Sequence, residues 1–341
     1  MPVKFYAHTP VESLGERGAL FEVARGLLER YGGADAPPFA LVANVVPDRS
    51  PAWRGYELTQ IDALLLGESF VALLDFKSVA RPVIGEENTR WAIVKRDNRL
   101  DHDVLGGSKI NPFLQLKHAR HQWSHFFREA TEPLLAEGEP SPFDWNELSG
   151  RVVFYPWLHH ESRLFAPPIW LRFLSARHVA ADAAATTAGF RLTPALMRAL
   201  AEDVLQAQVW DLTRYIRHSI FTLALVRSDG SPPHSYPIYA HSQVTIGRSS
   251  ANDIIIDDGY KRSSRYHARL VADDEDVRLY DEGSRHGTYV NERLVPPAGQ
   301  RLKIGDRIEF GRGVGEQRAQ VATGFIEPPR GQHPHDSRWT L

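Results

Sequence analysis

Two aspartates and a lysine on neighbouring segments form the first group of residues that could do chemistry. Asp62 lies in one apolar segment, and Asp75 and Lys77 lie in the next. A symmetric hairpin turn at residues 67–69 places Asp62 opposite Asp75, with Lys77 on the same face, because side chains alternate along a strand. Two carboxylates this close repel unless a cation compensates, and Mg²⁺ prefers one or two carboxylates with water and phosphate oxygens. The group predicts a metal site suited to phosphodiester hydrolysis; the alternative is a strand whose aspartates are neutralised by Lys77 or Arg81.

A second group of polar residues, in the C-terminal third of the chain, is suited to holding a phosphate. Arg248 follows an apolar strand, Ser264 and His267 are three residues apart, and Arg285 lies between two glycines. Phosphothreonine carries close to two negative charges and three acceptor oxygens, which arginine forks, hydroxyls and backbone N–H groups can satisfy. The alternative is that the glycines of this region only form hairpin turns.

The order of the sequence blocks around these residues resembles a forkhead-associated (FHA) domain, a β-sandwich that captures phosphothreonine peptides. The blocks are IGRSSANDIIID, SRYHARL, YDEGSRHGTYVN and LKIGDRIEFG. The resemblance implies that His267 braces the loops and that five residues contact the phosphopeptide: Arg248, Ser264, Arg265, Arg285 and His286. Two departures are that His286 stands where the family often has asparagine and that the segment 257–263 is longer than usual.

The N-terminal region resembles the nuclease-related domain (NERD) of the restriction-endonuclease-like group. The resemblance rests on a glutamate early in the first helix, the Asp and Asp-x-Lys described above, and Asn-Pro-x-x-Gln at a second helix. It implies an α/β restriction-endonuclease-like fold whose site residues are Glu16, Asp62, Asp75, Lys77 and Gln115. In this scheme Asp62 and Asp75 hold Mg²⁺ or Mn²⁺ and Lys77 acts on the attacking water. The family more often has glutamate at the position of Asp75.

Composition limits the classes of protein to which the chain can belong. Its 341 residues favour two or three domains, and a net charge of −2 confines any nucleic-acid contact to local basic patches. The absence of cysteine excludes disulfides and thiolate chemistry and favours a cytoplasmic protein. We expect no signal peptide and no membrane span, because acidic residues and glycine interrupt the longest apolar run, 61–74.

Periodicity and turn residues predict how the chain is divided. We expect helices over 13–30, 111–129 and 194–216, and strands over 41–46, 56–66, 70–79, 151–156 and 169–174. The predicted domains are a nuclease-like domain over 1–227, a linker over 228–237, an all-β sandwich over 238–327 and a tail over 328–341.

These patterns lead to three hypotheses for function. The first is a Mg²⁺-dependent nuclease acting on DNA, targeted by a phosphothreonine partner that is a Ser/Thr kinase or its substrate. The second is a catalytically inactive nuclease-like scaffold that binds phosphothreonine proteins. The third is that the chain binds its own phosphothreonine, with Thr186 and Thr187 as candidates.

Overall fold

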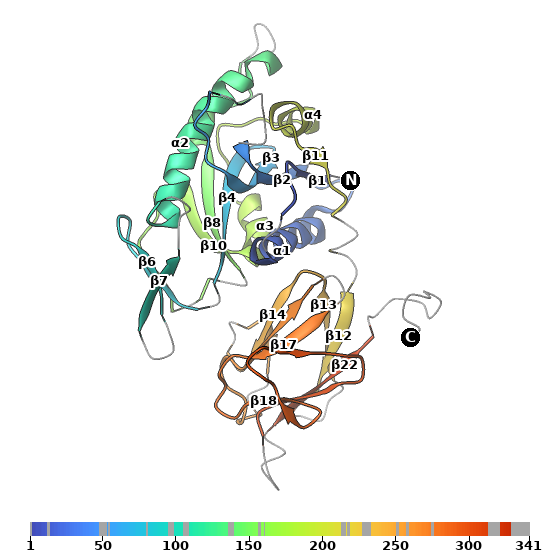
Figure 1. Cartoon of the computed structure of the whole chain (residues 1–341). Helices are drawn as coiled ribbons and strands as arrows, with labels where there is room; N and C mark the ends of the chain where they lie inside the picture. Colours follow the sequence, from blue (N-terminus) through green and yellow to red (C-terminus); the bar gives the residue numbers. More distant parts are fainter. Residues whose placement is uncertain are drawn as a thin grey trace. The chain divides into compact units, whose positions relative to one another are not determined.

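The protein consists of two compact units, Met1–Leu212 and Thr213–Leu341 (Figure 1). The structure is a computed structural model that describes residues 2–328, apart from 12–13, 48–52, 54, 80, 95–98, 105–108, 136–139, 156–157, 160, 213–215, 217–218, 227–232, 250–251, 257–258, 274–275 and 313–320. Each unit has its own apolar core.

A mixed seven-stranded sheet forms the centre of the first unit. Its strand order is β10-β8-β4-β3-β2-β1-β11. The β1–β2, β4–β8 and β8–β10 pairs are parallel and the others are antiparallel. The strands are β1 Val3–Ala7, β2 Phe39–Val45, β3 Ile61–Gly67, β4 Phe70–Ser78, β8 Ser149–Tyr155, β10 Leu171–Ser175 and β11 Gln208–Val209.

Helices cover both faces of this sheet. One face packs α2 and the segment that begins with α4 into a single core, which includes Val71 and Leu73 of β4. The other face carries α1, with α3 beside it, where the Tyr31 hydroxyl donates to the carbonyl of Ala180 (Figure 1). The helices are α1 Leu14–Tyr31, α2 Pro112–Ala130, α3 Val179–Ala184 and α4 Pro194–Ala199, and a π turn, Leu200–Val204, continues α4.

Smaller elements surround this central sheet. A four-stranded sheet has the order β7-β6-β5-β9. Its strands are β5 Val83–Gly85, β6 Trp91–Val94, β7 Leu100–Val104 and β9 Arg163–Leu164. The short 3₁₀ helices of the unit are Glu132–Leu134, Trp145–Glu147 and Ala176–His178.

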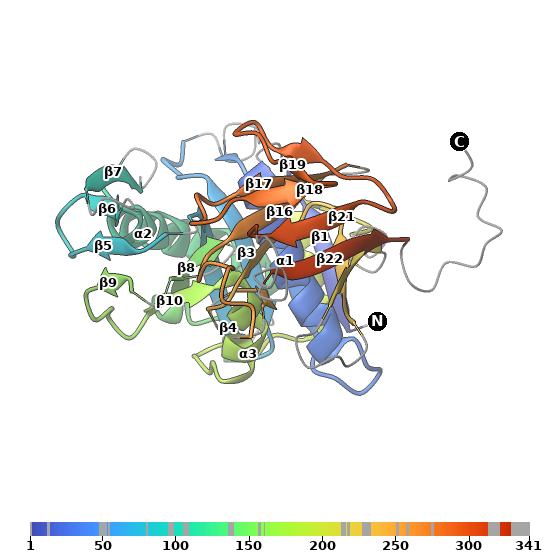
Figure 2. The same ribbon diagram turned by 90° about the horizontal axis from the view of Figure 1, so that it is seen from below.

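The second unit is a sandwich of two sheets (Figure 2). Their strand orders are β13-β12-β22-β21-β18-β19 and β15-β14-β16-β17-β20. Apolar residues of both sheets, among them Leu223, Ile246, Leu270 and Ile308, are fully buried between them. The strands are β12 Ser219–Leu225, β13 His234–Tyr239, β14 Gln243–Gly247, β15 Ile254–Ile255, β16 Ala268–Ala272, β17 Val277–Asp281, β18 Thr288–Val290, β19 Arg293–Leu294, β20 Gln300–Arg301, β21 Arg307–Phe310 and β22 Ala322–Glu327.

The predicted boundary between the domains lies too far along the chain. Residues 219–225, which we assigned to the first domain, form β12, which pairs with β13 and β22 of the sandwich. The predicted linker 228–237 runs into β13, and 228–232 lie outside the described residues. Ser, Pro and Gly in this stretch connect two paired strands instead of separating two domains. The contacts divide the chain after Leu212.

Two predicted elements differ in length from those observed. The helix predicted over 194–216 ends with the π turn at Val204, and β11 follows it. The strand predicted from residue 56 begins at Ile61. Both errors have the same cause. A connecting segment that packs on the core also carries apolar residues, and its sequence pattern then looks like that of a helix or a strand.

Among the described residues, no helix is long and apolar enough to cross a membrane.

Candidate functional site

The acidic group of the first unit lies on the hairpin β3–β4. The pairs Ala63–Leu74 and Gly67–Phe70 give the predicted register. Side chains alternate between the two faces of a strand, and Leu64 and Leu73 belong to the core beneath α2. Asp62, Asp75 and Lys77 therefore lie on that same face of the sheet. The Lys77 Nζ lies 2.7 Å from Asp75 Oδ1. Asp62 Oδ2 accepts a hydrogen bond of 2.6 Å from the backbone N–H of Phe76, so this carboxylate reaches across to β4.

Burial dominates the electrostatics of this group. The Asp75 side chain is almost completely inaccessible, and desolvation raises its pKa to about 7 although the Lys77 ammonium acts in the opposite direction. Desolvation also raises the pKa of Asp62, again against Lys77. Burial disfavours the charged form of Lys77, but the carboxylates of Asp75, Asp62 and Glu16 outweigh it and raise the lysine's pKa. The group is thus an acidic cup with one ammonium, in which Asp75 is buried and Asp62 and Lys77 are half-buried.

Helix α1 brings a third carboxylate into range of this cup. Glu16 lies in the first turn of α1. Desolvation is the main cause of its raised pKa, followed by Asp62, while Lys77 lowers it. The structure therefore brings together Glu16, Asp62, Asp75 and Lys77, as the sequence predicted them to lie.

Gln115 is positioned by the start of helix α2. The Asn111 side chain caps this helix by accepting from the N–H of Leu114 at 2.8 Å, and it donates to the carbonyls of Glu87 and Thr89. One turn further on, the side-chain Oε1 of Gln115 is buried and has no hydrogen-bond partner. Asp75 Oδ2 is buried and unpaired in the same way.

Buried polar atoms without partners are uncommon and mark places where a ligand can bind. Both atoms here are oxygens, the ligand type that Mg²⁺ prefers. No cluster of three or more acidic, histidine or cysteine side chains able to hold a metal occurs among the described residues. The predicted ligand pair, Asp62 and Asp75, remains chemically compatible with Mg²⁺, which binds proteins through one or two carboxylates. The assignment of Mg²⁺ therefore stays a prediction.

The phosphate-holding group of the second unit lies on three loops at one end of the sandwich. Arg248 directly follows β14, and its Nε donates to the carbonyl of Ser263 at 2.6 Å. Its N–H donates to the carbonyl of Ser264. The Ser264 hydroxyl accepts the backbone N–H of Arg285 at 2.9 Å. The arginine, the serine and the β17–β18 loop therefore meet at one place, as the sequence predicted.

His267 connects two of these loops from beneath. Its Nδ1 accepts from the N–H of Ser264 at 2.8 Å, and its Nε2 lies 3.1 Å from the carbonyl of Gly287. The first bond requires an unprotonated Nδ1, so Nε2 carries the proton and donates. His267 is fully buried, and desolvation lowers its pKa to about 4, although the bond to Gly287 acts in the opposite direction. The ring braces the loops, as predicted, and it does so in its neutral form.

Two residues that the sequence argument gave no role support the Arg248 loop. The Asn252 Nδ2 donates to the carbonyls of Ser249 and Arg265. Asp253 Oδ2 accepts from both the N–H and the hydroxyl of Thr245. The adjacent Asn and Asp between two apolar stretches were the available signal, because these side chains commonly bond to nearby backbone.

Gly247 shows how closely these loops approach each other. A Cβ at this position would lie 2.2 Å from the carbonyl oxygen of Arg265. That carbonyl is fixed by Asn252, so neither side can move to make room. Only glycine allows the Arg248 strand to pass so close to the Ser264 loop.

The remaining predicted contact residues lie on the same loops. The side chains of Arg265 and Arg285 are exposed, and that of His286 is half-buried. Desolvation, followed by the charges of Arg262 and Arg285, lowers the pKa of His286, so the imidazole is more readily neutral than usual. These residues surround the Arg248–Ser264 meeting point and point to a surface that receives an anion.

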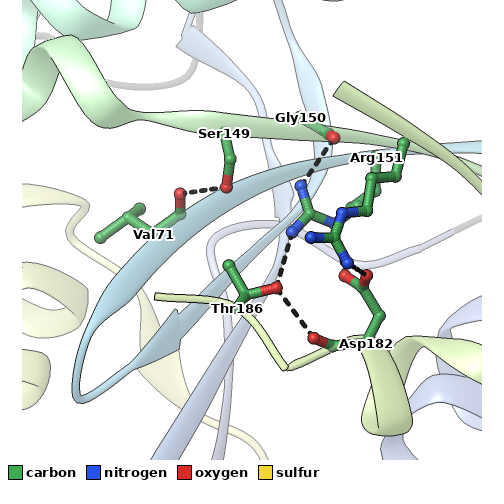
Figure 3. Close-up of polar contacts among 7 residues, drawn as sticks. Val71, Ser149, Gly150, Arg151, Asp182 and Thr186 are labelled. Atoms are coloured by element: carbon green, nitrogen blue, oxygen red, sulfur yellow. Dashed lines mark hydrogen bonds and ion pairs between the residues drawn. The ribbon is translucent and has the colours of Figure 1, made fainter. Parts of the chain in front are cut away.

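Thr186, one of the two threonines suggested as phosphorylation sites, is bonded to a buried ion pair (Figure 3). Arg151 Nε lies 2.6 Å from Asp182 Oδ2, and both side chains are buried. The Thr186 hydroxyl accepts from Arg151 Nη2 and donates to the carbonyl of Asp182. Thr186 is therefore a buried structural residue, whereas Thr187 beside it is exposed.

Comparison with known proteins identifies the second unit. Residues 244–311 match the FHA domain family. A 68-residue stretch is 38% identical to an oxoglutarate dehydrogenase inhibitor of Corynebacterium efficiens, and it covers 20% of this chain and 45% of that protein. The chain thus spans less than half the length of this relative. The second unit therefore contains an FHA domain, and the mixed α/β first unit precedes it.

Solved structures of low identity are also similar. The FHA domain of the CT664 protein from Chlamydia trachomatis is 18% identical, with a TM-score of 0.26 and coverage of 31% of this chain and 95% of that chain. The N-terminal FHA domain of S. cerevisiae Rad53p, in complex with a phosphothreonine peptide, is 23% identical, with a TM-score of 0.27 and coverage of 31% and 93%.

Proposed function

We propose that this protein is an adaptor whose FHA domain binds a partner phosphorylated on threonine. The observation that carries the proposal is the meeting of Arg248, the Ser264 hydroxyl and the N–H of Arg285 at one end of the sandwich. The family match over 244–311 supports it, because all of these residues lie within the match.

The arrangement suits a phosphate chemically. The Arg248 guanidinium is positioned through its Nε, which donates to the carbonyl of Ser263, and a guanidinium is a planar fork that matches the geometry of a phosphate. The Ser264 hydroxyl accepts the Arg285 N–H, so its oxygen is fixed and its own hydrogen is oriented away from that bond. Charge-assisted bonds from such donors to a phosphate are about twice as strong as neutral ones.

Titration of a phosphothreonine peptide library against the full chain tests this proposal. Truncating a charged partner in such a contact typically costs about 2–5 kcal/mol, so Arg248→Ala should weaken binding roughly a hundredfold. Arg278→Ala, an exposed arginine at the other end of β17, is the matched control and should bind like wild type. Equal affinity of the wild type and Arg248→Ala would remove Arg248 from the pocket.

As a second candidate function, we propose that the first unit is a nuclease-like domain that hydrolyses DNA phosphodiesters. The observation in its favour is the group of Asp62, Asp75 and Lys77, in which the buried Asp75 Oδ2 has no hydrogen-bond partner. Asp62 and Asp75 would hold Mg²⁺ or Mn²⁺, which when bound polarises a phosphodiester and acidifies a water. Lys77 holds a proton at Nζ beside this position and can orient the attacking water, while Glu16 adds negative charge that attracts the cation.

Metal binding can be measured apart from activity. Seven of the eight tryptophans lie in Met1–Leu212, so their fluorescence follows the unfolding of the first unit. At about 10 mM Mg²⁺ and a Kd of about 1 mM, binding should add roughly 1.4 kcal/mol of stability at pH 8. Asp75→Asn should abolish this increase and any Mg²⁺- or Mn²⁺-dependent plasmid cutting, while Arg248→Ala should leave both unchanged. A domain that gains no stability and cuts nothing leaves the adaptor as the whole function.

A further inference from the structure

The first unit contains a pocket that neither candidate function uses. Its volume is about 650 Å³, which is within the range of about 300–1,000 Å³ that small-molecule sites in proteins occupy. The residues that line it come from β1 and the residue before it, from the segment 34–38, from the start of β2 and from helix α4. No described residue of the acidic cup or of the FHA loops lines this pocket. It is therefore a separate candidate site.

Most of the lining is apolar and made of short or rigid side chains. Three prolines, four alanines and one methionine are among the lining residues. Proline has a fixed φ and alanine has no side-chain rotamers, so such a lining loses little conformational entropy when a ligand packs against it. A preformed lining of this kind favours binding, because the cost of ordering it has already been met in the folded protein. The pocket is therefore suited to the apolar body of a ligand.

Two cationic side chains also line the pocket, Lys4 from β1 and Arg198 from α4. No acidic residue is among the lining residues that the structure describes. Both cationic side chains are exposed, so they keep their hydration without a ligand. A concave surface that carries charges of one sign attracts small ligands of the opposite sign. The cations therefore indicate that the ligand is an anion.

A tyrosine hydroxyl lies near these cations. Tyr6 follows Lys4 by two residues on β1, so both side chains lie on the same face of the sheet. Burial is the main cause of the raised pKa of Tyr6, followed by the carboxylate of Glu202, whereas the guanidinium of Arg198 acts in the opposite direction. Arg198 is therefore close to this hydroxyl. The polar groups of the pocket gather around one part of its lining and leave the prolines and alanines for the rest.

The helical segment that carries Arg198 is irregular and firmly held. Helix α4 continues as the π turn Leu200–Val204, in which the N–H of Leu205 donates to the carbonyl of Leu200. Such turns are rare and frequently lie at functional sites. The carbonyl of Val204 accepts from the indole of Trp53, and the apolar residues of the turn are buried in the core. The core therefore fixes the position of this side of the pocket.

We propose that this pocket binds a small amphipathic anion. The apolar body of the ligand packs against the prolines and alanines, and its anionic group lies between Lys4 and Arg198. A carboxylate and a phosphate ester share the chemistry that these cations recognise, because both present charged acceptor oxygens to cationic donors. The proposal is independent of the adaptor and nuclease functions, since the described lining of the pocket shares no residue with either site.

Four ligands that share an octyl chain and differ in their head group test the proposal on the full chain. They are octanoate, octyl phosphate, octanol and octyltrimethylammonium, and isothermal titration measures their affinities. At least one of the two anions should bind roughly tenfold or more tightly than octanol, and the cation should bind more weakly than octanol. At about 0.5 M salt, screening should reduce the advantage of the anion. Comparison of octanoate with octyl phosphate distinguishes the two head groups.

Variants assign the binding to the pocket. Arg198→Gln should weaken binding of the anion roughly fivefold and leave that of octanol unchanged. Ala195→Phe adds a ring to the lining and should abolish binding of both, and Ala195 is exposed, so the substitution should not affect folding. Arg163→Gln on β9 and Ala181→Phe on α3 are the matched controls, because both residues are exposed and lie outside the pocket. Neither control should change either affinity.

Two results would overturn the proposal. One is equal affinity for the anions and octanol, which would show that Lys4 and Arg198 do not select the ligand. The other is the absence of binding by all four ligands, or binding that Ala195→Phe leaves unchanged, which would show that the pocket is not the site. Phosphopeptide binding and metal binding are measured separately, so either result leaves both proposed functions in place.

Discussion

The two candidate sites hold their charges in opposite ways. In the FHA domain, cations lie on exposed or half-buried loops, and a neutral histidine and backbone bonds position them. In the first unit, the carboxylates of a buried and a half-buried aspartate lie on two paired strands, with one lysine for partial compensation. Exposed cations cost little free energy and attract an anion from solution, whereas buried carboxylates raise the free energy of the fold until a proton or a cation reaches them.

Because of this contrast, substitutions in the two sites should affect the stability of the protein differently. The FHA loops are held by many separate hydrogen bonds, so substituting an exposed arginine should change binding without unfolding the domain. The acidic cup is part of the core, so a change in it alters stability and any ligand affinity together.

The largest effect is expected at Lys77. Lys77→Met removes the cation that lies 2.7 Å from Asp75 Oδ1 and leaves buried carboxylates uncompensated. The first unit should lose about 3 kcal/mol at pH 8. Urea unfolding followed by tryptophan fluorescence measures this. Arg285→Gln, an exposed cation of the FHA domain, is the contrasting control and should change stability by less than about 0.5 kcal/mol. A Lys77→Met protein as stable as wild type would show that the cup is not buried.

The two units should respond to pH in opposite directions. The pKa of His267 is lowered from 6.5 to about 4, so the unfolded chain binds this proton first as the pH falls. The FHA domain should lose about 3 kcal/mol between pH 6.5 and pH 4. The pKa of Asp75 is raised to about 7, so the folded first unit holds a proton that the unfolded chain releases. The stability of the first unit should therefore fall as the pH rises from 4 through 7.

Tryptophan fluorescence follows the first unit in this experiment, and phosphopeptide binding follows the second. His267→Gln should flatten the acid loss of the FHA domain, and Asp75→Asn should flatten the alkaline loss of the first unit. Parallel pH curves for both units would contradict the burial assigned to one of these groups.

The smallest effect is expected at Ser284. Its N–H and hydroxyl bond to Asp281, and these bonds outweigh desolvation and lower the pKa of that carboxyl. Ser284→Ala removes one of several bonds to Asp281 and should cost about 1 kcal/mol. Binding should weaken only a few-fold, because Arg285 keeps its N–H bond to Ser264. Isothermal titration against the same peptide checks this. A loss as large as that of Arg248→Ala would place Ser284 itself on the phosphate.

The sequence predicted the elements that place both sites, α1 and α2 among them, and missed pairings between strands that are distant along the chain. The β3–β4 register followed from one turn, because alternation fixes every side chain once the turn is known. Turn-forming residues and glycines mark the FHA loops in the sequence, so the proximity of Arg248 and Ser264 could be predicted. By contrast, β12 joins the sandwich through pairing with β22, which lies about a hundred residues further on, and local pattern holds no information on such a partner.

For the site of the first unit, the sequence predicted which residues lie together but not which hydrogen bonds they form. The sequence placed Asp62 and Asp75 face to face, whereas Asp62 accepts from the backbone of Phe76. The unpaired oxygens of Asp75 and Gln115 depend on how α2 packs over the sheet, which a strand pattern does not encode. The restriction-endonuclease-like assignment and its activity stay predictions.

The pairing of the first and last strands of the sandwich has a practical consequence. Thr222 of β12 lies opposite Glu327 of β22, so the points where the chain arrives and departs are neighbours. The other end of β12 adjoins the phosphate loops, since the carbonyl of Val226 accepts from the Tyr260 hydroxyl. The start of β12 and the end of β22 therefore both lie at the end of the sandwich that is remote from the phosphate loops. A module with adjacent ends can be transplanted into a surface turn of an unrelated host without straining either junction, and its recognition tip then faces outward.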